Sequence, residues 1–423
     1  MRIVADFHIH SPYARAVSKE MTLENLDYWA RFKGITVMGT GDFTHPAWIK
    51  EIKTKLIPAE EGLYVLKTQP SLQSRVPSFA VRFMLTVEIS SIYSKGGKTR
   101  RIHTLIFAPS IETAEKINAA LGWQGNLKSD GRPILGLDAK VLAKTVLDID
   151  PRCMIVPAHA YTPWFSVFGS MSGFNSLEEC FDEYTKYIYA VESGLSSDPA
   201  MSWRNSKLDH IAIISNSDSH SLQKIGREAN VFDTVLSYDS IMEVITSRDP
   251  SKFLFTVEFF PEEGKYHYDG HRVCKFSCAP EETKQLNKLC PNCGKPVTIG
   301  VMNRAAELAD RPFGYRPKRA IPYKNLVPLN EIIAESFGMG VAAKRVRDEY
   351  KNLVLKAGSE IAVLVDVSKS DLAVAATPEV VEGIMRVREG RLHIEPGYDG
   401  EYGKIKIFGE DERQRLKPQA SLF

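Results

Sequence analysis

Short apolar runs rich in β-branched residues alternate with amphipathic helical patterns through the first 260 residues, and this alternation constrains the fold most. Helical patterns such as Leu23–Phe32 and Ala139–Leu147 separate most of the runs. Strands that alternate with helices predict an α/β domain with a largely parallel sheet. Seven or eight such units fit a barrel better than an open sheet. The runs are Ile3–Ala5, Ile35–Met38, Phe83–Val87, Ile102–Phe107, Met154–Val156, Ile188–Val191, Ile211–Ile214 and Phe253–Val257.

A chain of 423 residues is too long for one ordinary core, so we expect smaller modules after this domain. Pro, Gly and charged residues interrupt the pattern at 258–270, where we place the boundary. In the last part, Ile361–Val365 and Ile405–Phe408 predict strands around a helix near Val380–Arg388. The expected parts are a catalytic barrel at 1–260, a four-cysteine segment at 271–300, a helical region with a basic loop at 301–360, a small domain at 361–408 and a flexible tail at 409–423.

The composition is that of a soluble globular protein, with 43% hydrophobic and 25% charged residues. The net charge is only +2, so any surface for nucleic acid must be local. No apolar run is long enough to span a membrane. The first residues, MRIVADFHIH, do not resemble a secretory signal, so we expect a cytoplasmic protein with reduced thiols.

Histidines and carboxylates stand at or just after the ends of the predicted strands. His8 and His10 follow the first run, and residues two apart in an extended segment point to the same side. In α/β barrels the chemistry is built at these strand ends. The further candidates along the chain are Asp42, Glu88, His103, His159, Asp218 and His220.

A lone histidine more often has another role, and a His-x-His pair alone is a weak signal. Candidate ligands that converge on one face count for more than any single match. Imidazole and carboxylate ligands together suit zinc, manganese or iron, and their number suggests a multinuclear site. Clustered divalent cations can generate hydroxide at neutral pH and hold phosphate oxygens during in-line attack.

The ordered series from His8 to His220 resembles the motifs of the polymerase and histidinol phosphatase (PHP) family. This resemblance implies a distorted barrel of about seven strand–helix units and two or three divalent metals, with Zn²⁺, Mg²⁺ and Mn²⁺ as candidates. It assigns one metal to His8, His10, Glu88 and Asp218, a second to Glu88, His103 and His159, and a third to Asp42 and His220. Among these, Asp42, Glu88, Asp218 and His220 are the expected catalytic residues. The family usually has a further His shortly after His-x-His, but 11–18 contains none, so the third metal is expected to be absent or weakly held.

Four cysteines cluster at Cys274, Cys278, Cys290 and Cys293. The sequence Cys-Pro-Asn-Cys-Gly-Lys at 290–295 is typical of a zinc knuckle, because the glycine lets backbone amides turn toward the sulfurs. Disulfides or free thiols are the alternative, which a reducing compartment disfavours. We therefore predict a structural Zn²⁺ held by these four thiolates.

A basic stretch without acids lies between Asp310 and Glu331, interleaved with Phe313, Tyr315 and Tyr323. Basic and aromatic groups together can contact phosphates and stack on bases, although an ordinary solvated loop has the same composition. The candidate DNA contacts are Arg311, Arg316, Lys318, Arg319 and Lys324.

The PHP-like core, the cysteine knuckle and the basic segment together resemble the endonuclease Q family, and the similarity extends into the segment Arg386–Tyr398. That resemblance implies a prokaryotic, chiefly archaeal, DNA repair enzyme. The family nicks DNA on the 5′ side of uracil, hypoxanthine, xanthine or an abasic site and leaves 3′-hydroxyl and 5′-phosphate ends. The alternatives are a small-molecule phosphatase of the histidinol-phosphate type, which leaves 271–423 without a role, and a DNA-binding module with a decayed metal site.

Two further segments fit a repair enzyme. A duplex hides the base edge, so the lesion must be flipped into a pocket, and the loop after His159 offers stacking and polar groups for its wall; the alternative is a loop that covers the barrel. The tail 419–423 resembles a short form of the box that binds the sliding clamp (PCNA), although a disordered tail is the alternative. The pocket residues are Tyr161, Trp164, Phe165, Phe168, Ser170, Ser172 and Asn175, and the clamp residues are Gln419, Leu422 and Phe423.

Overall fold

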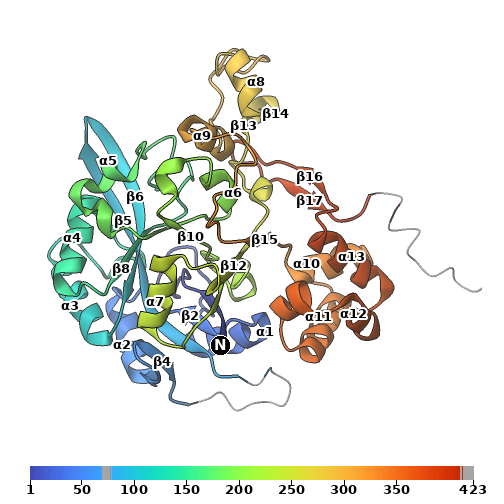
Figure 1. The fold of residues 1–423 in the computed structure, drawn as a ribbon, viewed down its shortest axis with the longest axis horizontal. Coiled ribbons are helices and arrows are strands. Elements are labelled where there is room, and N and C mark those ends of the chain that lie inside the picture. The colour runs from blue at the N-terminus through green and yellow to red at the C-terminus, as the bar shows by residue number, and fades with distance from the viewer. Residues whose placement is uncertain (69–76, 78, 410–411, 413–423) are drawn as a thin grey trace, which may run out of the picture.

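The computed structural model describes residues 1–68, 77, 79–409 and 412 (Figure 1). The predicted clamp box at 419–423 lies outside this range. Within the described part of the chain, no helix is long and apolar enough to cross a membrane.

Eight strands of the N-terminal part enclose one apolar interior, which confirms the α/β barrel. Alternate residues of the first strand, Ile3, Ala5 and Phe7, point into this interior, and each of the other seven strands adds at least one buried side chain. The Phe7 ring lies 5.3 Å from that of Phe107 and 6.4 Å from that of Phe232. The strands are β1 (Arg2–Asp6), β2 (Val37–Gly39), β5 (Arg82–Lys95), β6 (Lys98–Ala108), β8 (Met154–Pro157), β9 (Ala190–Glu192), β10 (Ala212–Ile214) and β11 (Ala229–Asp233).

The sheet is mixed, so the expectation of a largely parallel sheet was wrong. β1 pairs in parallel with β2, β2 with β5, and β9 with β10. In contrast, β11, β6 and β8 introduce antiparallel pairs. The cause at β5 and β6 is local, because Gly96 and Gly97 both have positive φ angles (62° and 71°) and close a hairpin by a two-residue turn.

Helices cover the outside of the barrel, and short strands extend its sheet. The expected helices at 23–32 and 139–147 are present as α1 and α4, and α1 is capped by Thr22 and ends at Gly34 with φ 88°. The helices are α1 (Leu23–Lys33), α2 (Pro46–Lys55), α3 (Ile111–Gly122), α4 (Ala139–Ile149), α5 (Leu177–Phe181), α6 (Pro199–Ser202) and α7 (Tyr238–Ser247). The added strands are β3 (Leu56–Pro58), β4 (Leu63–Leu66), β7 (Ile134–Leu135), β12 (Phe253–Glu258) and β15 (Tyr323–Asn325).

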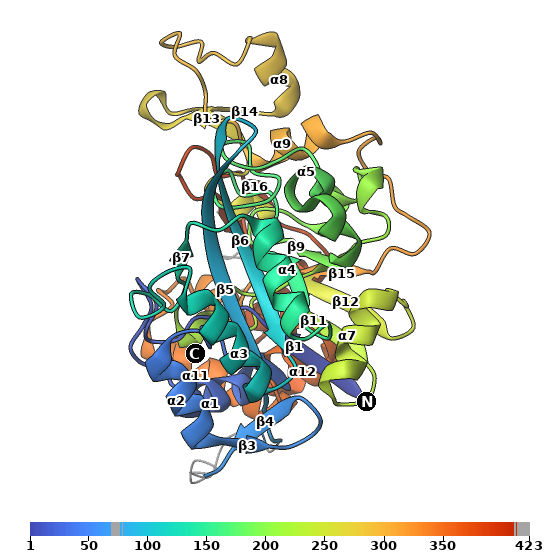
Figure 2. The ribbon, with the colours of Figure 1, turned by 90° about the vertical axis from the view of Figure 1, so that its left-hand side faces the viewer.

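The cysteine segment forms an arm that projects from one end of the molecule (Figure 2). It contains β13 (Asp269–His271), β14 (Phe276–Cys278) and α8 (Pro280–Gln285), and α9 (Val301–Leu308) follows it. The tip of the β5–β6 hairpin projects from the same end (Figures 1 and 2). We call residues 269–299 the arm.

Four helices pack together at the side of the barrel after the arm: α10 (Leu329–Phe337), α11 (Lys344–Ala357), α12 (Lys369–Ala375) and α13 (Pro378–Arg388). The expected strand at Ile361–Val365 was wrong, because Ala362–Asp366 form a π-helical turn, η6. Its apolar run is buried among these helices, and a short apolar run alone does not distinguish a buried helix from a strand. The last strands, β16 (His393–Glu395) and β17 (Lys404–Lys406), form an antiparallel ribbon.

Candidate active site

His8 and His10 directly follow β1 and lie at the end of the barrel where the C-terminus of this strand is. The segment between them is locked to the loop after β10, because the backbone N–H of His10 donates to the carbonyl oxygen of Ser219 (3.0 Å). Ile9 and Ser219 form an isolated parallel bridge. This pairing brings the His-x-His segment and the Asp218–His220 segment together from opposite ends of the barrel sequence.

Glu88 is the centre of the cluster, and its side chain is buried. Its Oε1 lies 2.8 Å from His103 Nδ1 and 3.1 Å from His159 Nε2. Its Oε2 lies 3.5 Å from Nε2 of both His8 and His10. A carboxylate with two histidines on each oxygen has the geometry of a bridge between two cations.

Three overlapping groups have donor atoms close enough to share a cation. Their donor atoms lie within 4.8 Å of one another, and Glu88 and His10 each belong to two groups. The Asp218 side chain is 27% exposed and that of His220 33%, so the site opens to solvent at these two residues. The groups are His8, His10 and Glu88; Glu88, His103 and His159; and His10, Asp218 and His220.

Asp42 contacts the ring nitrogen of His10 that does not face Asp218. Its Oδ1 lies 3.0 Å from His10 Nδ1, and its Oδ2 accepts a hydrogen bond from the backbone N–H of Ser11 (2.6 Å). The residue is fully buried. Asp42 therefore orients His10, so that His10 Nε2 faces Asp218 at 3.1 Å.

The donor set fits divalent cations. The Nε2 atom of His8 is buried and has no hydrogen-bond partner in the described structure, which suits a nitrogen that coordinates a metal. Burial alone raises the pKa of Glu88, but His103, Arg132 and His8 lower it well below its usual value. Burial also lowers the pKa of His103 to about 4. Glu88 is thus ionised and His103 neutral, which are the forms that bind metal. Burial lowers the pKa of His8 and His10, but the neighbouring carboxylates raise it well above its usual value, so a cation would displace protons from these two rings.

Two residues that the sequence did not single out organise the ligands. Glu192, at the end of β9, lies 3.1 Å from His8 Nδ1 and accepts hydrogen bonds from the His159 N–H and the Asn216 amide (both 2.9 Å). Arg132 donates to Glu88 Oε2 (3.0 Å). Both stand at the ends of loops or strands, but nothing in a single sequence distinguishes them from other acidic or basic residues.

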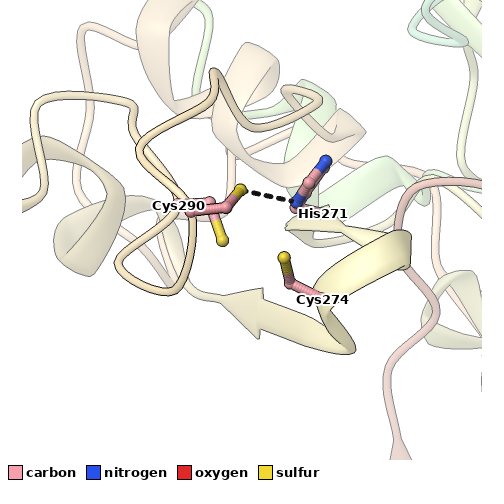
Figure 3. Close-up of side chains that lie close together, drawn as sticks. His271, Cys274 and Cys290 are labelled. Atoms are coloured by element: carbon pink, nitrogen blue, oxygen red, sulfur yellow. Dashed lines mark hydrogen bonds between the residues drawn. The ribbon is translucent and has the colours of Figure 1, made fainter.

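In the arm, donor atoms of one histidine and three cysteines lie within 4.8 Å of one another: His271, Cys274, Cys290 and Cys293. Figure 3 shows the first three of these side chains converging. Nδ1 of His271 lies 3.4 Å from Cys293 Sγ. The loop at 290–295 makes a tight turn, since the Gly294 N–H donates to the Cys290 carbonyl (2.8 Å) and φ of Gly294 is 69°.

Cys278 lies outside this group, although the sequence pattern included it. Its thiol is buried and lies 3.1 Å from Thr283 Oγ1, which in turn bonds Asp269. Ligation by the four cysteines stays a prediction, and the group adds His271 as a candidate ligand. Its spacing of two residues from Cys274 mirrors that between Cys290 and Cys293, and this spacing could have identified it.

The predicted lesion-pocket residues divide into two sets. Tyr161 and Phe168 are buried and pack against each other (5.2 Å between ring centroids), so they cannot stack on a base in this conformation. Ser170, Ser172 and Asn175 bond backbone or Arg304. In contrast, Trp164 and Phe165 are half-buried, and the Phe165 ring lies 4.7 Å from that of His103. Of these two, Phe165 contacts a residue of the metal cluster, whereas the Trp164 ring lies 5.4 Å from that of Tyr266.

The basic segment 311–324 packs on the barrel away from the metal ligands. Arg311 pairs with Asp209, which precedes β10, whereas Asp218 follows that strand. Arg319 donates to the Ser247 carbonyl oxygen (2.9 Å). Arg316, Lys318 and Lys324 are exposed and form no ion pair within the described part of the chain.

Comparisons with known proteins agree with this architecture. A sequence family described as the MJ0043 C-terminal domain matches residues 328–391, which include helices α10–α13. The uncharacterized protein MJ0043 of Methanocaldococcus jannaschii is 33% identical over 256 residues, which are 59% of this chain and only 31% of that protein.

Two solved structures match from end to end. The lesion-specific endonuclease PfuEndoQ from Pyrococcus furiosus is 31% identical, with a TM-score of 0.85, over 99% of this chain and 98% of that one. The chain belongs to the endonuclease Q family. An endonuclease Q in complex with a 27-mer duplex substrate, with an abasic lesion at the active site, is 32% identical with a TM-score of 0.84. That match covers 100% of this chain and 99% of that one, so the family resemblance includes the arm and the C-terminal helices.

Proposed function

We propose that this member of the endonuclease Q family is a metal-dependent DNA repair endonuclease. It would hydrolyse the phosphodiester on the 5′ side of a deaminated base or an abasic site and leave 3′-hydroxyl and 5′-phosphate ends. One observation carries the proposal: three ligand groups, linked through the shared residues Glu88 and His10, lie in a chain that a lesion-specific endonuclease matches over 99% of its length. A small-molecule phosphatase would need only the metal cluster.

The position of each residue determines the role that we propose for it. Divalent cations at the three groups would supply the activated water and the charge that stabilises the phosphate. Glu192 and Asp42 hold His8 and His10 in the orientations that ligation needs. Asp218 and His220 line the solvent-exposed side, where a strand must enter. Arg132 is charged, partly exposed and only 3.0 Å from Glu88, so its free N–H groups can bind a phosphate oxygen.

DNA would approach the end of the molecule that carries the arm. The β5–β6 hairpin continues past Glu88 and bears Lys95, Lys98 and Arg100 at or near its tip. The flipped nucleotide would meet Trp164 and Phe165 beside His103. Of the basic segment, Arg316, Lys318 and Lys324 remain candidates for phosphate contacts, whereas Arg311 and Arg319 brace the fold. A zinc ion at the arm would be structural, because four protein ligands close its coordination.

The test is a labelled duplex that carries one uracil, hypoxanthine or abasic site, incubated with Mg²⁺, Mn²⁺ or Zn²⁺ and, separately, with a chelator. We expect a nick 5′ to the lesion that the chelator abolishes and that Asp218→Ala lowers by at least about a hundredfold. Asp148→Ala, a surface change on α4, is the matched control. No nick with any metal, together with release of phosphate from small phosphomonoesters, would favour the phosphatase.

A further inference from the structure

A cavity of about 560 Å³ lies between the barrel and the C-terminal helices, and none of its lining residues is a metal ligand. Helix α1 forms one wall and α11 another, while Gln223 and Asn330 close the ends. Its volume falls within the roughly 300–1,000 Å³ that is typical of small-molecule sites. The function proposed above gives this cavity no role.

Aromatic side chains line the two walls. Tyr28, Trp29 and Phe32 come from α1, and Tyr350 comes from α11. Tyr350 is held in place, because its hydroxyl donates to Glu360 Oε2 (2.6 Å), which also pairs with Lys33 (2.6 Å). The pair of Lys33 and Glu360 is buried and internally neutralised, so it fixes the ring rather than attracting a ligand. Fixed aromatic faces stack on planar heteroaromatic rings at little entropic cost.

The rim of the cavity is positively charged. Arg347 and Lys351 stand one turn apart on α11, both are exposed, and neither forms an ion pair in the part of the chain that the structure describes. Among the described residues, no acidic side chain lines the cavity. The first turn of α11 contains Lys344, Arg345 and Arg347 and no acid, although cations at a helix N-terminus oppose its dipole. Such a violation of a local rule is expected where an anion binds.

We propose that this cavity binds a nucleotide. The base stacks against the α1 aromatics and Tyr350, and its phosphate lies on Arg347 and Lys351. A free nucleoside phosphate and a nucleotide within a DNA strand present the same chemistry. Gln223, three residues after His220, would contact the bound nucleotide, so the site borders the loop that carries two metal ligands.

Trp29 provides the readout. Purified full-length protein, with no added divalent metal, is titrated with dAMP and separately with an undamaged hexamer of deoxyadenylate, and tryptophan fluorescence is recorded. Trp29→Phe identifies the part of the signal that belongs to the cavity. We expect saturable quenching that is absent in Trp29→Phe and whose dissociation constant rises about tenfold or more in the Arg347→Glu, Lys351→Glu double variant. Lys369→Glu, an exposed change on α12 outside the cavity, leaves the dissociation constant unchanged.

The two titrations, with dAMP and with the hexamer, identify the source of the ligand. Quenching by dAMP indicates a free nucleotide, and quenching by the hexamer alone indicates a strand; either result supports the proposal. Binding at the metal cluster is separated by Asp218→Ala, which should leave the Trp29 signal intact even if nicking is lost. The proposal is overturned if neither ligand quenches Trp29, or if the double variant binds as tightly as the native chain.

Discussion

Replacing Glu192 with Gln should weaken metal binding without unfolding the protein. The carboxylate of Glu192 is fully buried and only accepts hydrogen bonds: from His8 Nδ1 (3.1 Å), from the His159 N–H (2.9 Å) and from the Asn216 amide (2.9 Å). A glutamine amide of the same shape accepts on one side only. Either orientation therefore turns its NH₂ group toward one of these donors.

The magnitude follows from the lost contact. A hydrogen bond to a charged acceptor contributes about 1.5–3 kcal/mol, which corresponds to roughly 10- to 100-fold in an equilibrium constant. Loss of the carboxylate also removes the preference for a proton on His8 Nδ1, which leaves Nε2 free to bind a cation. Residues that orient metal ligands typically change metal affinity by about the same 10- to 100-fold. We therefore expect a 10- to 100-fold weaker binding of the first metal.

Mn²⁺ is the suitable probe, because it prefers nitrogen and oxygen ligands over the thiolates of the arm. Free Mn²⁺ is counted by its electron paramagnetic resonance signal during a titration. The matched control is Glu360→Gln, which removes an equally buried carboxylate that holds Lys33 and Tyr350. This control should lower the melting temperature and leave Mn²⁺ affinity unchanged. If folded Glu192→Gln binds Mn²⁺ within twofold of the native protein, the positioning role assigned to Glu192 is wrong.

Three other predictions concern stability, zinc and lesion selectivity. Burial raises the pKa of Glu258 to about 8, so the folded state binds a proton that the unfolded state releases. The free energy of unfolding therefore falls as pH rises from about 4.5 to 8, by up to ~1.4 kcal/mol per pH unit. Glu258→Gln should flatten this slope in thermal melts between pH 5 and 9. Cys290→Ser should remove one zinc per chain by elemental analysis, whereas Cys278→Ser should not; equal loss in both would restore Cys278 to the ligand set. Trp164→Ala should reduce nicking at a lesion by about five- to 100-fold, as expected for one lost stacking contact of about 1–3 kcal/mol. The affinity for undamaged DNA should fall less, and an equal loss of both would indicate a general DNA contact instead.

The sequence predicted the α/β barrel and the convergence of the histidines because both depend on short-range rules. An apolar run followed by His8 and His10, or by Asp218 and His220, places its polar residues at a strand end whatever the rest of the chain does. The pairing between strands was harder to predict. The Gly96-Gly97 turn was visible in the sequence, yet the runs on either side were treated as separate strands rather than as one hairpin.

Contacts between distant segments were the harder part to predict. Glu192 acts through His8, which is 184 positions away, and Arg132 reaches Glu88 because β7 pairs with β5. The position of His271 beside the cysteines also depends on the tertiary structure: β13 and β14 pair Asp269 with Cys278, and the Cys278 thiol contacts Thr283. Spacing identified the cysteine segment, but it did not identify His271 as a neighbour of three of these sulfurs.

Backbone strain at the ligands supports the view that the cluster is functional. Asp42, His159 and Asp218 follow three different strands, and each has a positive φ (48°, 30° and 45°), a conformation that costs a residue other than glycine about 1–3 kcal/mol. Hydrogen bonds hold two of them in place: Asp42 bonds the candidate ligand His10, and the His159 N–H donates to Glu192, which also contacts His8. Gly194 packs against His159, and only glycine fits there, because a Cβ on residue 194 would lie 2.5 Å from the His159 Cβ. Glycine at these three turns would relieve the strain. The presence of Asp, His and Asp there is explained if His159 and Asp218 bind cations and Asp42 orients His10, because a glycine can do neither.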